Sequence, residues 1–331
     1  MFTCGGRRVA LIEAFRHAMK QLDITGKVLV TDITPASATF HTADEAMLVP
    51  TADDEDYIPT LIKICDNHNI GLVIPLTDLD LRIIATHRND FEKIRSKVMI
   101  GAPETILTCQ DKIRTSKFLK KIGLKPIRTF TLSQFRERPF FPCFIKPLRG
   151  SASMGTGVLN CESELNAHLA AYGESMLVQD YIPGAEYTLD IYRNKAGEVL
   201  CVVPRQRLSI RAGEVEKGLT VNDAELIEAG VRIGENLEGV WGVVNAQCRR
   251  PPGGKPHFFE INPRFGGGVP LAIAAGANLP RYVLEETLGL PVSAELGSFK
   301  SNLLMLRYDS AIFVHVDNPE TLPGYSTQMS R

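Results

Sequence analysis

Along residues 1–100, short apolar runs alternate with stretches in which apolar residues return every three or four positions. The stretches at 9–22 and 57–67 have the spacing of amphipathic helices. The apolar runs are typical of buried strands and lie at residues 28–31, 47–49, 72–75 and 97–100. Alternating strands and helices predict a doubly wound parallel α/β domain, which binds ligands at the carboxyl ends of its strands.

After a break at 101–103, the pattern becomes richer in strands. Residues 111–122 predict a basic helix that ends at Gly123, and residues 223–238 predict another helix. Strands are expected at 143–147, 157–160, 177–181, 187–192 and 199–203. Two more, at 240–248 and 257–262, flank the turn RRPPGGKP and predict a hairpin. The predicted fold class is therefore α/β, with an α+β character in the C-terminal part.

The chain has 331 residues, which at about 100–200 residues per domain suggests two or three units. Residues 301–316 are apolar and strand-like, so they either complete the core or form an interface. The pattern thus leaves a homodimer open.

Composition excludes several classes of protein. A hydrophobic content of 44% is too high for a disordered chain. Lys and Arg number 37 against 38 Asp and Glu, a balance that argues against binding to nucleic acid or to a membrane surface. No apolar run approaches the roughly 20 residues of a membrane span, and the first residues lack a signal-peptide pattern. The seven cysteines are dispersed without a CxxC pair, so we expect a cytoplasmic protein with reduced thiols.

The first chemical signal is a predicted strand that contains Lys146 and leads into the loop GSASMGTG at 150–157. Backbone N–H groups of such a loop can hold phosphate oxygens, and a lysine adds a positive charge. The segment is not a Walker A motif, because no GK[ST] opens a helix. An ordinary hairpin turn is the alternative interpretation.

The second signal is QDYIPGAEY at 179–187, a strand that leads through a bend into another strand. Backbone groups of the bend can recognise an adenine edge, and Glu186 can accept hydrogen bonds from ribose hydroxyls. The alternative is a surface turn with a solvated glutamate.

The third signal combines Gln247 with FEINPRFGGG at 259–268. Glu260 and Asn262 are two residues apart on a predicted strand, so their side chains share one face, and Gln247 precedes them on the neighbouring strand. These oxygen donors suit Mg²⁺, which keeps waters and nucleotide phosphates as further ligands. Arg264 follows, where it can meet developing negative charge. The alternative is a buried polar face without a metal.

Together, and in this order, the three signals resemble the ATP-grasp superfamily, most closely the carbamoyl-phosphate synthase large-subunit branch and its single-module relatives. The resemblance rests on DK at 111–112, IKP at 145–147, the loop at 150–157, QDYIPGAEY, VNAQ at 244–247 and FEINPRFGGG. It implies an N-terminal α/β domain at 1–105, an ATP-grasp small lobe at 106–180 and a large lobe with the metal site at 181–331.

The resemblance also implies a role for each matching residue. Lys146 and Arg264 match the catalytic positions. The implied ATP-binding residues are Lys112, Lys146, Ser151, Ala152, Ser153, Gly155, Gln179, Asp180, Ile182, Glu186 and, by a looser match, Arg211. The implied metal ligands are Gln247, Glu260 and Asn262, which would hold one or two Mg²⁺ or Mn²⁺ ions.

The activity implied is that of an ATP-dependent carboxylate–amine ligase, which forms an acylphosphate from a small carboxylate and then an amide. Phosphorylation of bicarbonate or carbamate, and a non-catalytic ATP-binding module, stay open as alternatives. The segment TCGGRR at 3–8 falls short of the dinucleotide pattern GxGxxG. The resemblance instead leads us to expect that this loop lines the acceptor site, with Arg7 or Arg8 facing a carboxylate.

Overall fold

The structure is a computed structural model that describes residues 1–148, 155–211, 213–319 and 322. The N-terminal domain is a parallel sheet with strand order β3-β2-β1-β4-β5. Its strands are β1 (Phe2–Thr3), β2 (Leu29–Asp32), β3 (Glu45–Leu48), β4 (Leu72–Pro75) and β5 (Lys97–Val98). Its helices are α1 (Val9–Gln21), η1 (Ala38–His41), α2 (Tyr57–Asn67), α3 (Leu81–Thr86), α4 (Arg88–Lys93) and α5 (Pro103–Gln110). The predicted doubly wound α/β domain is confirmed.

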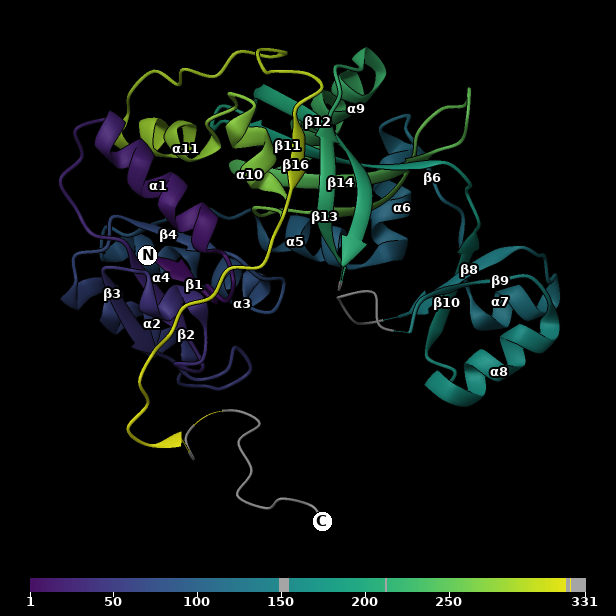
Figure 1. Cartoon of the computed structure of the whole chain (residues 1–331), viewed down its shortest axis with the longest axis horizontal. Coiled ribbons are helices and arrows are strands. Elements are labelled where there is room, and N and C mark those ends of the chain that lie inside the picture. The colour runs from purple at the N-terminus through teal and green to yellow at the C-terminus, as the bar shows by residue number, and fades with distance from the viewer. Residues whose placement is uncertain (149–154, 212, 320–321, 323–331) are drawn as a thin grey trace.

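A small antiparallel sheet with order β7-β10-β8-β9 projects to one side of the molecule (Figure 1). Its elements are β7 (Thr129–Thr131), α7 (Leu132–Glu137), β8 (Cys143–Pro147), β9 (Gly157–Leu159), α8 (Glu162–Tyr172) and β10 (Met176–Asp180). The antiparallel pairing places Lys146 opposite Leu177, and Gln179 opposite Phe144. The residues of the first two chemical signals therefore lie on adjacent strands.

The largest sheet has the order β16-β13-β12-β11-β14-β15-β6 among the described residues. Its strands are β6 (Lys125–Pro126), β11 (Ala185–Arg193), β12 (Val199–Arg211), β13 (Glu214–Thr220), β14 (Gly242–Arg250), β15 (His257–Asn262) and β16 (Leu304–Leu306). Its helices are α6 (Lys112–Lys121), α9 (Ala224–Asn236), α10 (Val269–Ala274) and α11 (Leu279–Leu288). Because β6 pairs with β15, part of the stretch 106–180 belongs to this central sheet.

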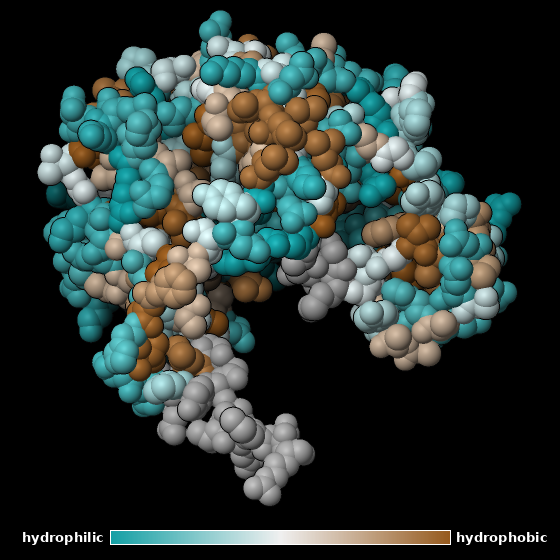
Figure 2. Space-filling model, in the orientation of Figure 1, coloured by the Kyte–Doolittle hydropathy of each residue, from teal (hydrophilic) through white to brown (hydrophobic). Residues whose placement is uncertain are grey.

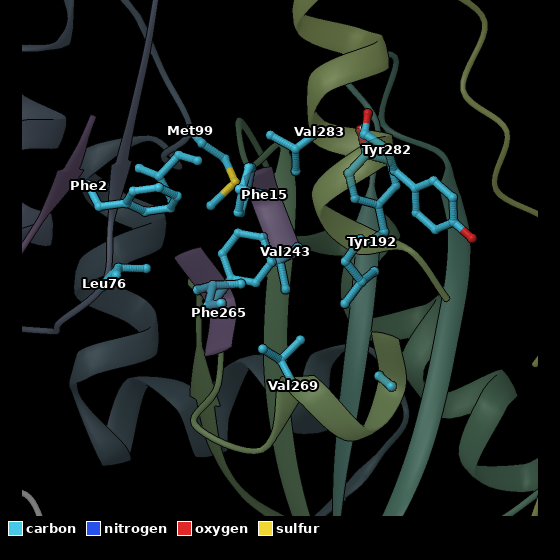
Figure 3. Packing of buried hydrophobic residues seen from close by; sticks show 14 of the residues in the cluster. Phe2, Phe15, Leu76, Met99, Tyr192, Val243, Phe265, Val269, Tyr282 and Val283 are labelled. Atoms are coloured by element: carbon cyan, nitrogen blue, oxygen red, sulfur yellow. The ribbon is translucent and has the colours of Figure 1, made fainter. Parts of the chain in front are cut away.

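The N-terminal domain and the central sheet share one hydrophobic core (Figure 3). Phe15 on α1 lies edge-on to Phe2 at 5.0 Å and to Phe265 at 5.6 Å between ring centroids. Trp241, just before β14, donates from Nε1 to the carbonyl of Val98 at 3.0 Å. Packing of this kind fixes the ends of the N-terminal strands relative to β15.

Apolar side chains gather on the surface near the β16 edge of the central sheet (Figure 2). The exposed apolar residues in this region are Leu208, Ile210, Leu304 and Leu306. Of the predicted strand-like segment 301–316, only Leu304–Leu306 pairs with β13, and Phe313 is 93% exposed. Among the described residues, no helix is both long and apolar enough to cross a lipid bilayer.

Candidate active site

Two lysines from different elements lie close together beside the small lobe. Lys146 lies near the end of strand β8 and is buried, whereas Lys112 is the first residue of α6, a helix whose N-terminus is capped by Asp111. The Asp111 side chain accepts from the backbone N–H of Ile113 at 2.8 Å and thereby fixes where the helix begins. Lys112 Nζ donates to the carbonyl of Leu148 at 3.5 Å.

Burial lowers the pKa of Lys146 to about 8; Glu260 opposes this change, and the charge of Lys112 adds to it. Among the described residues, no carboxylate lies within ion-pair distance of Lys146. The Nζ of Lys146 is 5.7 Å from the ring centre of Phe259. A buried lysine beside a second lysine, without a paired carboxylate, is an arrangement that an anionic ligand would stabilise.

The candidate metal ligands come together as the sequence predicts. Gln247 on β14 stands directly opposite Glu260 on β15, and Asn262 is two residues further along the same face. Asn262 Nδ2 donates to Glu260 Oε1 at 2.8 Å. The carboxylate of Glu260 and the amide oxygen of Asn262 are hard donors that fit Mg²⁺ when nucleotide phosphates complete its coordination, whereas Gln247 Oε1 accepts a hydrogen bond from Arg207. No cluster of three His, Cys, Asp or Glu residues suited to a metal occurs in the described ranges.

Sequence reasoning missed a line of arginines that connects this group with Glu186. Glu186 on β11 is flanked in register by Arg207 on β12 and Arg249 on β14. Arg207 Nη1 lies 3.0 Å from Glu186 Oε1 and donates to Gln247 Oε1 at 2.9 Å. Arg249 Nη2 donates to Glu186 Oε2 at 3.0 Å. Glu186 is thus held in place between two cations.

The side chains of the stretch between the small sheet and the central sheet are bonded within the protein. Gln179 is buried, and its Nε2 donates to Thr129 Oγ1 at 2.7 Å. Asp180 accepts from Arg128 Nε at 2.7 Å and from Nη2 at 2.9 Å. Backbone groups are bonded as well: the Asp180 N–H donates to the carbonyl of Arg128, and the carbonyl of Ile182 accepts from Arg249 at 3.4 Å. Contact of this stretch with adenine stays a prediction.

Arg264 follows the candidate metal ligands Glu260 and Asn262 in the chain and forms hydrogen bonds to the N-terminal domain. Its Nε donates to Asp78 Oδ1 at 3.0 Å, and its Nη2 donates to the other oxygen of that carboxylate. Nη1 also donates to the carbonyl of Phe265 at 3.1 Å. Asp78 lies in the loop after β4, and nothing in the sequence pattern singled it out.

Arg211 is the predicted site residue with the weakest link to the others. It pairs with Asp309 and lies 3.6 Å from Glu216, with 57% of its side chain exposed. Gly155 is described and has a φ of +64°. Ser151, Ala152 and Ser153 lie outside the described residues. The roles of all these residues stay predictions.

Two parts of the chain match known protein families. Residues 1–99 match the N-terminal domain of PylC-like proteins. Residues 173–308 match a family described as ATP-grasp in the biosynthetic pathway with the Ter operon. Residues 173–308 thus belong to an ATP-grasp domain. The family predicted from the motifs is therefore confirmed, and the N-terminal domain is PylC-like.

Three known proteins illustrate what the whole chain resembles. A D-alanine–D-alanine ligase of Thermotoga petrophila is 30% identical over 224 residues, which are 59% of this chain and 64% of the relative. The match thus spans less than two thirds of that relative. The biotin carboxylase domain of a 2-oxoglutarate carboxylase from Hydrogenobacter thermophilus, solved with MgADP and bicarbonate, superimposes with a TM-score of 0.70 at 15% identity, covering 92% of this chain and 72% of its own. An L-amino acid ligase from Bacillus licheniformis gives 0.68 at 17%, covering 91% and 76%.

Proposed function

We propose that this ATP-grasp protein is an ATP-dependent carboxylate–amine ligase. The observation that carries the proposal is the buried Lys146, beside Lys112 and facing the Glu260–Asn262 pair without a paired carboxylate among the described residues. The two lysines support binding of a polyphosphate, and the Glu260–Asn262 pair supports binding of its metal counter-ion. The ligase activity named for two of the similar proteins supports the same reaction class.

The chemistry proceeds in two steps. A carboxylate oxygen of the acceptor attacks the γ-phosphorus of ATP, and the bond to the β–γ bridging oxygen breaks, which leaves ADP and an acylphosphate. An amine then attacks the acyl carbon and expels phosphate, so an amide forms and the amine loses a proton.

Each group of side chains has a part in these steps. Lys112 and Lys146 stabilise the charge on the phosphates, and Arg264 stabilises the charge that develops on the transferred phosphoryl group. Glu186 accepts from the ribose hydroxyls, and the backbone at 179–182 contacts adenine. Mg²⁺, as one or two ions, would be held by Glu260, Asn262 and Gln247, and would neutralise phosphate charge. Mn²⁺ has the same preference for these oxygen donors.

Release of ADP tests the proposal across a panel of small carboxylates and amines. We expect ADP formation to need both partners, with one amide formed per ADP. Lys146→Met should abolish turnover, and Lys120→Met, on the exposed face of α6, serves as the matched control. ADP release stimulated by bicarbonate without an organic acid would favour the bicarbonate reaction instead. Tight MgADP binding without turnover of any pair would favour a non-catalytic module.

The exposed apolar residues at the β16 edge, together with the dimer formed by the similar biotin carboxylase domain, support a homodimer for this chain. Light scattering on the purified protein tests it. A mass of about twice the 36.5 kDa of the chain is expected, and one equal to that of the chain would contradict it.

A further inference from the structure

Four arginines from three separate parts of the chain surround the segment that follows the candidate metal ligands. Strand order in the N-terminal sheet reverses between β1 and β4, and ligands of open α/β sheets bind at such a reversal. The loop after β1 carries Arg7 and Arg8, and the loop after β4 carries Asp78. Arg264 follows β15, and Arg307 follows β16.

Glu214, at the start of β13, joins two of these arginines. Its carboxylate lies 3.4 Å from Arg8 Nη2, and it accepts from Arg307 Nη1 at 2.9 Å. The backbone of Gly267 lies directly against this group, since a Cβ there would come within 2.6 Å of Arg8 and 2.7 Å of Glu214. The Arg8–Glu214–Arg307 group is thus in contact with the glycine segment at 266–268.

Positive charge exceeds negative charge around this group. Burial lowers the pKa of Arg8; Glu214 opposes this change, and Arg264, Arg307 and Arg7 reinforce it. Asp78 is committed to Arg264, and Glu214 pairs with both Arg8 and Arg307. Asp32 accepts from the backbone N–H of Gly6, beside the loop that carries Arg7. These residues thus comprise four arginines and three carboxylates, an excess of one cation that a bound anion would balance.

A buried arginine with one unpaired donor also lies against the glycine segment, at Gly268. Arg205 is 1% exposed, and its ion pair with Asp190 uses Nε and Nη2. Its Nη1 has no hydrogen-bond acceptor among the described residues, and a Cβ at Gly268 would overlap it. A donor left unpaired inside a protein is costly unless a ligand or water satisfies it.

We propose that the acceptor acid carries a second anionic group, a carboxylate or a phosphate, and that this group binds Arg8 and Arg307 in place of the Glu214 carboxylate. This inference rests on the proposed function, because the first carboxylate is the one that ATP activates beside Arg264. Gly267 is three residues after Arg264, and three residues of chain span at most about 10 Å. The two positions are therefore close enough together for the two ends of one short diacid. Glu214 is then an internal anion that the substrate displaces.

Matched pairs of acids test the proposal, with ADP release measured at a fixed amine: butyrate against succinate, pentanoate against glutarate, and glycerate against 3-phosphoglycerate. We expect kcat/KM to be at least about tenfold higher for the acid with two anionic groups, since its second group makes charge-assisted hydrogen bonds to Arg8 and Arg307 that a monoacid cannot make. Comparing the succinate and phosphoglycerate arms shows which group is preferred. Equal kcat/KM within every pair would overturn the proposal.

Three variants separate substrate binding from a structural role. Arg8→Gln and Arg307→Gln should lower kcat/KM about tenfold for the doubly charged acid and less than about threefold for its monoacid. Glu214→Gln should act in the opposite direction and lower KM for the doubly charged acid, because it removes the competing carboxylate. If all three variants impair both acids equally, the group is only structural and the proposal fails.

A binding measurement keeps this inference distinct from the proposed ligase activity. If no acid supports ADP release, the proposed function fails. Thermal shift with MgADP and the same acids then decides whether the second anionic group binds at Arg8 and Arg307. A rise in Tm with succinate or 3-phosphoglycerate that is absent with the monoacids and lost in Arg8→Gln supports the binding site. The absence of any such rise in the wild-type chain overturns it.

Discussion

Arg264 Nε donates to Asp78 Oδ1 at 3.0 Å, and a second hydrogen bond joins Arg264 Nη2 to the other carboxylate oxygen. This pair connects the end of β15 to the loop after β4, which belongs to the N-terminal domain. It also holds the guanidinium in one orientation, since two parallel bonds fix its plane. Asp78 is therefore a positioning residue for Arg264.

Replacing Asp78 with Asn should lower kcat several-fold and leave KM for ATP within about twofold, because Arg264 loses its orientation but keeps its charge. The free energy of unfolding should fall by only about 1 kcal/mol, since Asp78 is 37% exposed. Urea unfolding and ADP release measure the two effects. Asp90→Asn, which removes an exposed pair with Lys93, is the control. A double-mutant cycle with Arg264→Gln that shows no coupling in kcat would contradict the positioning role.

Nucleotide affinity should depend on pH through Lys146. Below a pKa of about 8 this lysine is charged before ADP binds, so its contribution is constant. Above that pH the free site holds a neutral lysine, whereas bound phosphates favour the charged form and require it to take up a proton. The affinity for MgADP should thus fall, by up to about tenfold per pH unit, between pH 8 and the higher pKa of the complex.

Calorimetry in buffers with different ionisation enthalpies measures that proton uptake directly. In Lys146→Arg the side chain stays charged, so the affinity should not fall over the same range. In Lys146→Met the affinity should be weak throughout. A wild-type affinity that is constant from pH 7 to about pH 10 would exclude Lys146 as a phosphate contact.

Glu186→Gln should separate recognition of the ribose from recognition of phosphate. The variant should weaken ADP binding about tenfold but leave pyrophosphate affinity within about twofold, because the role proposed for Glu186 is to bind the sugar and not the phosphates. Glu228→Gln, at an exposed position on α9, controls for the change of charge. Equal loss of affinity for ADP and pyrophosphate would instead assign Glu186 a purely structural part between Arg207 and Arg249.

A substitution at Gly268 tests how closely the glycine segment at 266–268 packs against the buried Arg205. A Cβ at this position would overlap Arg205 Nη1 and lie 2.5 Å from Val215 Cγ1. Gly268→Ala should therefore reduce the free energy of unfolding by about 2–3 kcal/mol. Gly71→Ala is the matched control, since a Cβ at Gly71 would meet nothing within 4 Å, and it should change stability by less than about 0.5 kcal/mol. Urea unfolding of both variants measures the difference.

The order of elements could be predicted well because it depends on local patterns. The hairpin of β14 and β15 forms where the turn RRPPGGKP predicts it, and the N-terminal sheet is parallel as the alternation of strands and helices indicates. The two-residue strand Phe2–Thr3 was missed, although it is central to its sheet. It is too short to show a period, and its pairing with β2 and β4 is set by tertiary contacts.

The candidate site was only half predictable, for a related reason. Glu260 and Asn262 share one face by their spacing, and the same spacing links Asn245, Gln247 and Arg249 on β14. Polar residues two apart also occur at 205 and 207 on β12, a signal that could have identified the arginines beside Glu186. Asp78 had no such signal, because it lies in a loop and its partner Arg264 is distant in sequence. Glu214 and Glu216 are two apart on β13, but nothing in that spacing indicates the distant partner Arg8.

The chain has one tryptophan, and that residue spans the boundary between two parts of the fold. Trp241 belongs to the central sheet region, its indole N–H bonds to Val98 in the N-terminal domain, and Lys195 lies 4.3 Å from its ring centre. Its fluorescence therefore reports one junction and is free of background from other indoles. If the N-terminal domain separates from the central sheet before either unfolds, a single emission spectrum will record that event on its own.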